Sequence, residues 1–271
     1  MEIIQYHDSL FDSIQRRVSR RSYAAKPAME ELEELSRYAW ALTAAAQGKV
    51  RIEVFADGAE DIFQGLTNSY GMISGARSFA AFIAAAPEDD ADLPDEAMLL
   101  TGYYGEQFVL RATALGVATC WIAGSFDKNT AKRVASVRDK ERLLCVSPLG
   151  HAEDRFSFKE KLIKGFATSR RRKPLQDIVA NHDVLELAPD WFRVSLEAAR
   201  VAPSAMNGQP WTFTLFPADE SIAAQAGGKG HLAPLDLGIA LSHLHIAAVH
   251  SGVEGEWNVQ DGRWIFARRS E

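Results

Sequence analysis

The sequence predicts an α+β protein made of two related but unequal halves. Short apolar stretches typical of strands alternate with longer segments in which apolar residues recur at helical spacing. Glycine and proline stand at the ends of several of these segments, where they open or terminate regular structure. In addition, a constant offset in residue number relates two long helical stretches, which indicates internal repetition.

The first half, residues 1–165, is expected to contain most of the regular structure. Strands are expected at residues 50–55, 79–85, within 116–124 and at 143–149. Helices are expected from Asp8, from Pro27, over 96–115 and over 127–136. The 79–85 stretch is apolar throughout, so its strand should be central in a sheet. Residues 87–95 are expected to form a loop, and residues 151–173 to connect the two halves.

The second half, residues 166–271, repeats this order in a shorter form. Its elements are expected to be a helix over 190–201, a strand over 211–216, a glycine-rich loop at 226–230 and a very apolar helix over 235–251. Gly116 and Gly252 follow the two long helices at the position that favours glycine. The pair Asp261-Gly262 is typical of a two-residue hairpin turn, so the chain should end in a β-hairpin.

The two long helices and the residues after them match at one offset. Leu99 pairs with Leu235, 136 residues later. The same offset relates Gly102 with Gly238, Leu110 with Ile246, Ala112 with Ala248, Gly116 with Gly252, Val117 with Val253 and Trp121 with Trp257. An upstream match of Lys26-Pro27 with Lys173-Pro174 needs another offset, so the copies have diverged by insertion and deletion. We interpret the chain as an internal duplication.

The composition is that of an ordinary soluble globular protein. Hydrophobic residues make up 47% and charged residues 24% of the chain. The net charge of −6 gives no basic field that would indicate a nucleic-acid partner. Cys120 and Cys145 belong to no CxxC or zinc-ligand pattern. The N-terminus lacks the features of a signal peptide, and no apolar stretch reaches the length of a bilayer span, so we expect a cytoplasmic protein.

A basic segment follows the first helix. Arg17, Ser19 and Arg21 alternate in it, so their side chains point to one side if the backbone is extended. Two guanidinium groups and a hydroxyl group on one side form a strong site for a phosphate dianion. Taken alone, however, such a segment is more often a solvated basic turn. We also expect the run Arg170–Arg172 to be solvated, with a place near the phosphate as the alternative.

Residues 202–211 (APSAMNGQPW) form a second polar segment, between a predicted helix and a predicted strand. Ser204, Asn207 and Gln209 present hydroxyl and amide groups there. Amide side chains both donate and accept hydrogen bonds, as the edge of a flavin or nucleobase ring requires. The alternative is a helix-to-strand turn whose residues serve only the turn geometry. The combination favours a binding function.

Together these motifs resemble those of the nitroreductase superfamily, whose members bind flavin mononucleotide (FMN). The R-x-S-x-R-x-[FY] motif of the family is matched by residues 17–23, and its P-S-x-x-N-x-Q-P-W motif by residues 203–211. The long helix followed by residues 115–124 is a third resemblance. The resemblance implies the FMN-dependent nitroreductase fold, and these FMN-binding residues: Arg17, Val18, Ser19, Arg21, Ile122, Ala123, Gly124, Pro203, Ser204, Ala205, Asn207 and Gln209.

The resemblance also implies an NAD(P)H-dependent oxidoreductase. NADH or NADPH would deliver hydride to flavin N5, and a nitroaromatic or quinone would then occupy the vacated place and accept the reducing equivalents. No catalytic acid or base stands out in the sequence. Two alternatives stay open. One is ene-reduction, dehalogenation or flavin modification on the same scaffold. The other is a non-enzymatic protein that binds or sequesters flavin, which the lack of a nicotinamide-binding motif would fit.

The spacing of the two short motifs departs from the family pattern. Ordinary members carry them about one helix apart, whereas here most of the chain separates them. The chain therefore resembles a fused, asymmetric form of the usual homodimer, which could be a monomer, with further pairing left open. One site would combine residues 17–21 with residues 203–209. In the other, the motif residues are replaced by Ala44, Gln47, Phe166 and Thr168, so we expect one FMN per chain.

Other candidate motifs are weaker. His243 and His250 are seven residues apart on one helix face, with His245 between them. Without a metal-ligand spacing and a nearby carboxylate, we expect core or flavin-facing histidines and no metal site. The glycine-rich residues 227–230 lack the full phosphate-binding loop pattern. Ser204 has no G-x-S-x-G sequence around it, which excludes a serine hydrolase.

Overall fold

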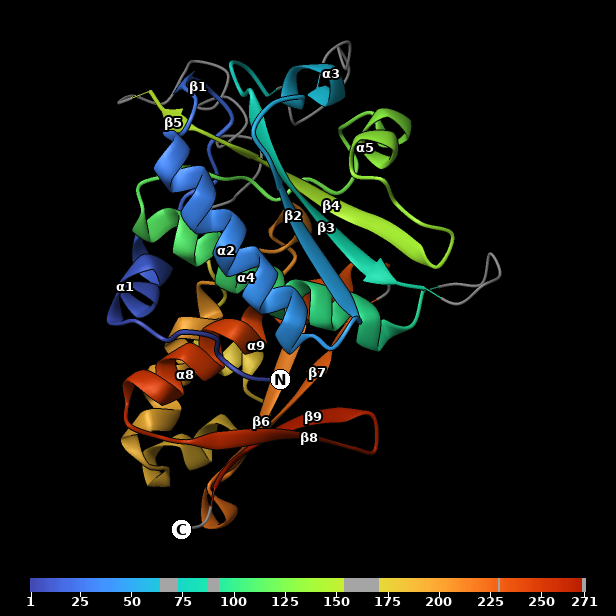
Figure 1. Cartoon of the computed structure of the whole chain (residues 1–271). Helices are drawn as coiled ribbons and strands as arrows, with labels where there is room; N and C mark the ends of the chain where they lie inside the picture. Colours follow the sequence, from blue (N-terminus) through green and yellow to red (C-terminus); the bar gives the residue numbers. More distant parts are fainter. Residues whose placement is uncertain (64–72, 87–92, 154–170, 229, 270–271) are drawn as a thin grey trace.

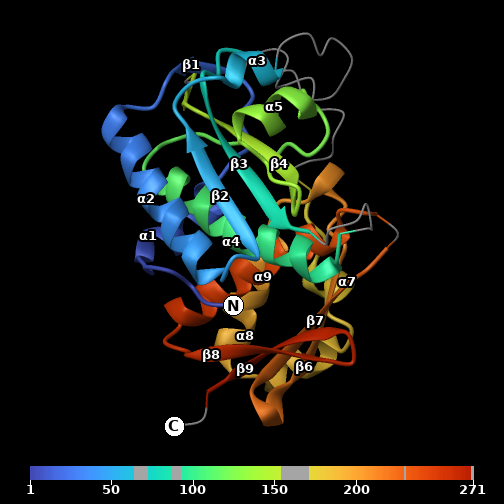
Figure 2. The ribbon, with the colours of Figure 1, turned by 45° about the vertical axis from the view of Figure 1, so that its right-hand side comes forward.

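The computed structural model describes residues 1–63, 73–86, 93–153, 171–228 and 230–269. Figures 1 and 2 show three layers: an upper sheet, a central layer of helices that includes α4 and α9, and a lower sheet. The upper sheet belongs to the first half of the chain and the lower sheet to the second half. The predicted boundary at residue 165 lies outside the described residues, as does most of the predicted 87–95 loop.

The helices are α1 (Asp8–Arg16), α2 (Met29–Ala45), α3 (Ala59–Phe63), α4 (Asp95–Ala114), α5 (Lys128–Val134), α7 (Leu175–Ile178), α8 (Asp190–Arg200) and α9 (Ala233–His250), with short 3-10 turns at His182–Leu187, Ala205–Asn207 and Pro217–Asp219. The strands are β1 (Tyr23–Ala25), β2 (Val50–Phe55), β3 (Ser78–Ala85), β4 (Glu141–Leu149), β5 (His151–Ala152), β6 (Trp211–Phe216), β7 (Ser221–Ala226), β8 (Gly255–Gln260) and β9 (Arg263–Arg268). Among the described residues, no helix combines the length and the apolar character needed to cross a membrane.

The two main sheets share one topology. Strands β2, β3 and β4 form an antiparallel sheet in that order, and β6, β7 and β9 form its counterpart. In each half, the long helix follows the second strand of the sheet. At the outer edge of the lower sheet, β8 pairs with β9. In the upper sheet, the place that corresponds to β8 is taken by Ala118 and Ile122, which form isolated bridges to the β4 side. The order of elements therefore agrees with the repeat in the sequence.

The central helices α4 and α9 cross at two glycines. A Cβ atom on Gly102 would overlap the carbonyl group of Leu235, and a Cβ atom on Gly238 would overlap that of Leu99. Only glycine allows two backbones to approach so closely. Because Gly238 is the repeat partner of Gly102, and Leu235 that of Leu99, the contact is reciprocal. Reciprocal contacts of this kind occur at the two-fold axis of a symmetric dimer.

Most of the predicted elements are confirmed. The strands at 50–55 and 211–216 have the predicted bounds, and the predicted helices differ from the observed ones by one or two residues at most of their ends. Gly116 and Gly252 adopt the left-handed conformation after α4 and α9, with φ of 80° and 75°. Asp261 and Gly262, with φ of 51° and 73°, form the turn between β8 and β9.

A central strand was missed, and one predicted strand was wrong. No strand is predicted between residues 217 and 226, yet β7 lies there in the middle of the lower sheet. Its sequence, SIAAQA, is rich in alanine, which has little intrinsic preference for strands, and its pairing with β6 and β9 decides its conformation. The strand predicted within 116–124 is instead a series of isolated bridges, because Thr119 pairs with Ser19 while its neighbours pair with the β4 side.

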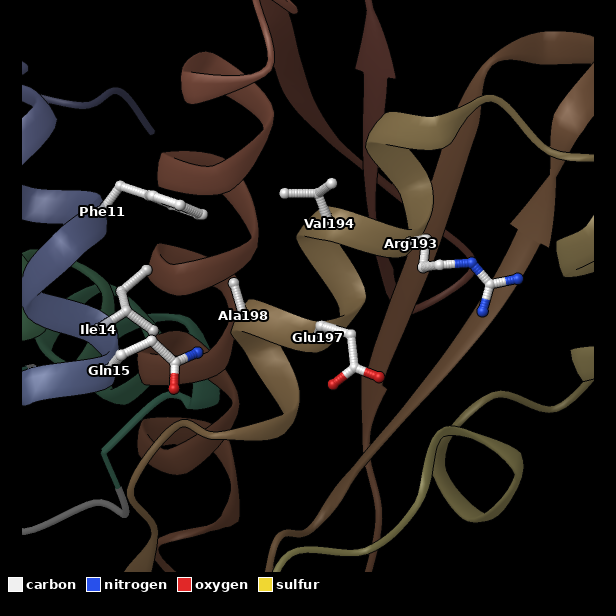
Figure 3. Close-up of a pocket in the computed structure, with 7 residues that line it drawn as sticks. All are labelled: Phe11, Ile14, Gln15, Arg193, Val194, Glu197 and Ala198. Atoms are coloured by element: carbon white, nitrogen blue, oxygen red, sulfur yellow. The ribbon is translucent and has the colours of Figure 1, made fainter.

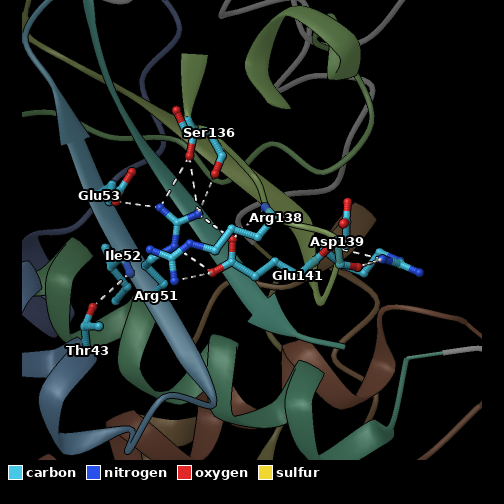
Figure 4. A network of polar contacts seen from close by, with 10 residues as sticks. Thr43, Arg51, Ile52, Glu53, Ser136, Arg138, Asp139 and Glu141 are labelled. Atoms are coloured by element: carbon cyan, nitrogen blue, oxygen red, sulfur yellow. Dashed lines mark hydrogen bonds and ion pairs between the residues drawn. The ribbon is translucent and has the colours of Figure 1, made fainter. Parts of the chain in front are cut away.

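Arg51 on β2 ties the upper sheet to the connection between α5 and β4 (Figure 4). Its guanidinium group donates to both carboxylate oxygens of Glu141, at 2.9 and 2.6 Å, and to the carbonyl oxygen of Ala135 at 3.3 Å. Burial acts to raise the pKa of Glu141, but the hydrogen bonds from Arg51 and Arg138 outweigh it and hold the pKa below its usual range. These partners belong to adjoining elements of one half, so we interpret the cluster as structural.

Candidate functional site

The basic segment after α1 lies against residues 117–122. Arg17 ends α1 with an extended backbone. Ser19 pairs with Thr119 in a parallel bridge, and the N–H of Arg20 donates to the carbonyl oxygen of Thr119 at 2.9 Å. A guanidinium nitrogen of Arg17 donates to the Ser19 hydroxyl at 3.4 Å. This contact places the side chains of Arg17 and Ser19 on one side, as the alternation predicts, whereas Val18 is 42% exposed.

The loop 203–209 after α8 has an unusual backbone. Met206, Asn207 and Gln209 have φ of 50°, 56° and 49°, a conformation that costs a side-chain-bearing residue about 1 kcal/mol. Among the contacts that hold the loop, the N–H of Gln209 donates to the Ser204 hydroxyl at 2.9 Å, and the N–H of Ala205 donates to a carboxylate on α9. Strained backbone that is maintained by specific contacts is found mostly at binding and catalytic sites.

The amide groups of this loop contact residues 171–173. The Asn207 amide accepts a hydrogen bond from the Arg172 guanidinium and donates one to the carbonyl oxygen of Arg171 at 2.9 Å. The Gln209 amide accepts from the N–H of Lys173 at 2.8 Å. The prediction that Arg172 is solvated is therefore wrong, because its side chain is half-buried and binds Asn207. Arg170 of the same run lies outside the described residues.

Contacts link the basic segment to the residue before Ile122–Gly124, and a charge effect links it to Arg172, which binds the 203–209 loop. Burial lowers the pKa of Arg172, and the neighbouring charges of Arg17 and Arg200 lower it further. The Nε atom of Arg17 lies 3.6 Å from the Glu106 carboxylate on α4. That carboxylate accepts a hydrogen bond at 2.7 Å from Trp121, the residue before Ile122–Gly124. Tertiary packing thus places residues of the basic segment near residues that lie far from them in the sequence.

Comparison with known proteins identifies the family. A family model described as "Putative TM nitroreductase" matches residues 9–248. The chain belongs to this nitroreductase family. The structure is similar to the crystal structure of a putative nitroreductase from Thermotoga maritima, at 20% sequence identity and a TM-score of 0.62, over 98% of each chain. This similarity, like the α+β topology, confirms the predicted nitroreductase fold.

Further solved structures align with part of the chain. A putative NADH oxidase from Clostridium acetobutylicum covers 54% of this nitroreductase-family chain and 90% of its own, at 20% identity and a TM-score of 0.41. An FMN-dependent nitroreductase from Clostridium difficile gives the same coverage, identity and TM-score. A search of the curated proteins returned no match.

The residues at this place fit the FMN that the nitroreductase family implies. Arg17 and Arg172 bring two positive charges near each other in a partly buried setting, which favours a bound dianion such as a phosphate monoester. At Gly124, no described atom lies within 4 Å of the position that a Cβ atom would take, so a flat ring system can approach the backbone there.

Asp236 on α9 is a site residue that the sequence analysis missed. It is 4% exposed, and its two carboxylate oxygens share one donor, the N–H of Ala205, at 3.0 and 3.1 Å. Burial raises its pKa to about 7, against the opposing effect of that N–H. Burial and then the charge of Asp236 raise the pKa of Cys145 on β4 to about 12. Asp236 is therefore the α9 residue that holds the backbone of the 203–209 loop. A lone acid in the apolar run 235–249 is the signal that could have revealed it.

We expect Asp236 to make the stability of this protein depend on pH. Because its pKa in the folded state, about 7, is above the unfolded value of about 3.9, the folded state binds the proton more tightly. Its stabilising contribution is complete below the unfolded pKa and is lost as the pH rises through the folded pKa. From about pH 5 to about pH 8, Asp236→Asn should lose about 2 kcal/mol less folding free energy than the wild type.

Urea unfolding at the two pH values measures this difference. Asp219→Asn is the matched control, because Asp219 lies in an exposed turn outside the site. Identical pH dependence in the wild type and Asp236→Asn would mean that Asp236 titrates normally.

Other features of the structure lie outside this candidate flavin site. A groove of about 260 Å³ runs between α1 and α8 and is lined by Phe11, Ile14, Val194 and Ala198 (Figure 3). It contains no residue that the family motifs assign to the flavin. Among the described residues, no cluster of side chains could hold a metal ion. Cys120 and Cys145 are buried thiols that are not joined in a disulfide.

The three histidines of α9 differ in environment. His243 and His245 are buried, which confirms them as core residues. Tyr103 and Trp257 contact Nδ1 of His245, and burial lowers its pKa to about 3. His250 is exposed and stacks on Phe11 with ring centroids 3.9 Å apart, so the expectation of a core or flavin-facing histidine is wrong for it.

Proposed function

We propose that this protein is an FMN-dependent oxidoreductase that uses NADH or NADPH to reduce a nitroaromatic or quinone-type acceptor. The observation that carries the proposal is the contact of Arg17 and Trp121 with one buried carboxylate, Glu106, together with the charge effect of Arg17 on Arg172, which binds Asn207 of the 203–209 loop. Family membership supports the same reading. When bound, FMN would supply the hydride transfer, because no protein side chain can perform it.

The residues of the chain would bind and orient the cofactor. Arg17, Ser19 and Arg21 would hold the phosphate through charge-assisted hydrogen bonds. The backbone N–H groups of Ala123 and Gly124 would face the ring and stabilise negative charge on it. The 203–209 loop would cover the ring from the second half, with its backbone held by Asp236 and its Asn207 and Gln209 amides anchored on residues 171–173. Nicotinamide and acceptor would use the same open face in turn.

We further propose that the chain is a fused pseudo-dimer with one complete flavin site. The matching sheet topologies and the reciprocal glycine contact between α4 and α9 support a duplication. In the complete site, the phosphate segment comes from the first half and the loop from the second. At the position of the first half that corresponds to this loop, Ala44 and Gln47 stand in place of Ser204 and Asn207. The remaining replaced residues, Phe166 and Thr168, lie outside the described residues. A single chain would then need no partner to bind FMN.

A flavin titration tests both proposals. Apoprotein, quantified by amino-acid analysis, is expected to bind one FMN per chain, and NADH or NADPH is then expected to bleach the bound flavin under anaerobic conditions. A stoichiometry near two would contradict the asymmetric site, and one near one-half would place the site between chains. Binding of FMN without bleaching by either nicotinamide would contradict the enzymatic part and favour a flavin-binding protein. Failure to bind FMN would overturn the proposed function.

A further inference from the structure

A buried carboxylate, Glu106, joins the phosphate segment to the rest of the candidate site. It lies in the middle of α4 and is completely buried. A buried carboxylate costs several kcal/mol unless it is paired and hydrogen-bonded. Both of its oxygens are engaged: Oε2 accepts from the indole N–H of Trp121 at 2.7 Å, and Oε1 lies 2.9 Å from Nε2 of His243. Glu106 therefore has a polar partner at each of its two oxygens.

Arg17 approaches the same carboxylate from the phosphate segment. Among the guanidinium nitrogens, Nε approaches the carboxylate most closely, at 3.6 Å from Oε1. This distance is an ion pair and is too long for a hydrogen bond. Glu106 thus attracts the guanidinium from its Nε side. The terminal nitrogens, which form the fork that a phosphate binds, point elsewhere, and one of them donates to Ser19.

His243 extends the connection into the second half of the chain. Its Nδ1 lies 2.9 Å from the carbonyl oxygen of Ala198 on α8. A carbonyl oxygen only accepts, so Nδ1 carries a hydrogen and donates it. Ala198 lies in the last turns of α8, the helix that leads into the 203–209 loop. Glu106 is therefore in contact with a residue of the phosphate segment, a residue beside Ile122–Gly124 and, through His243, the helix that carries the loop.

We propose that Glu106 is a positioning residue of the flavin site, which sets the orientation of Arg17 relative to Trp121 and α8. This inference depends on the proposed function, since it concerns the same site. A core ion pair without this role would stabilise the fold and leave ligand preference unchanged. A purely electrostatic role predicts the opposite sign, because a negative charge next to a phosphate site weakens anion binding and its removal strengthens it.

Glu106→Gln distinguishes these cases, because it keeps the shape and removes the charge. Its affinities for FMN and riboflavin are measured by fluorescence titration. We expect FMN binding to weaken about tenfold and riboflavin binding to weaken less than about threefold, since only FMN carries the group that Arg17 would hold. Glu34→Gln is the matched control, because Glu34 pairs with Arg111 at 2.7 Å outside the site, and it should leave both affinities unchanged.

The outcomes separate the inference from the function on which it rests. If the wild type binds FMN, and Glu106→Gln binds it equally well or more tightly, the positioning role is wrong while the proposed function stands. Equal weakening for FMN and riboflavin would also overturn it, because a general loss of structure has no preference for the phosphate. A wild type that binds no FMN would contradict the function itself. If Glu106→Gln does not fold, Glu106→Asp keeps the charge, and the same selective loss is expected from its shorter reach.

Discussion

Replacing Gly238 with alanine should destabilise the protein by about 3 kcal/mol or more, because the added methyl group overlaps the Leu99 carbonyl group where α9 crosses α4. Alanine improves helix propensity by about 1 kcal/mol, which offsets only part of this cost. Backbone cannot move aside as a flexible side chain can. The separation of α4 and α9 would therefore have to increase, with loss of contacts along both helices.

Urea unfolding of the wild type and the variant measures this change. Gly102→Ala should have a similar effect, since its methyl group would overlap the Leu235 carbonyl group in the same way. Gly230→Ala is the control, because no described atom lies within 4 Å of its Cβ position. A Gly238→Ala variant as stable as the wild type would mean that the helices do not cross at these glycines.

Replacing Arg21 with alanine should weaken FMN binding by about ten- to a hundredfold, which is the cost of losing one or two charge-assisted hydrogen bonds to a phosphate. Riboflavin has the same ring and no phosphate, so its affinity should change little. Arg21 has a buried Nε atom, whereas the adjacent Arg20 donates to the carbonyl oxygen of Glu153 at 2.7 Å in an exposed position. Arg20→Ala is therefore the matched control.

Fluorescence titrations of both flavins with both variants decide the assignment. Arg20→Ala should bind FMN as the wild type does. Equal weakening of FMN and riboflavin in Arg21→Ala would show that the loss is structural, and the phosphate would have to bind elsewhere.

The motif that contains Asn207 and Gln209 did not predict the partners of their side-chain amides. The sequence places them beside a flavin by resemblance. In the structure, their amides hold residues 171–173, a structural interpretation that differs from the local turn geometry of the alternative. The two interpretations are compatible, since an amide anchored on its neighbours can still present a rigid loop to a ligand. Their partners, however, lie more than thirty residues away, and no local pattern indicates them.

The sequence by itself determined the local structure and the family. Helical periodicity, the glycines after α4 and α9 and the Asp261-Gly262 turn depend on neighbouring residues, so they can be predicted from a short window. The two motifs and the repeat likewise survive as patterns along the chain. Only the tertiary structure decided the conformation of β7, whose alanine-rich sequence becomes a central strand through pairing with β6 and β9. Tertiary packing also decided the burial of Asp236 and the contacts of Glu106 with Arg17, Trp121 and His243. The energies of these groups depend on desolvation and on partners distant in sequence, which a pattern along the chain does not record.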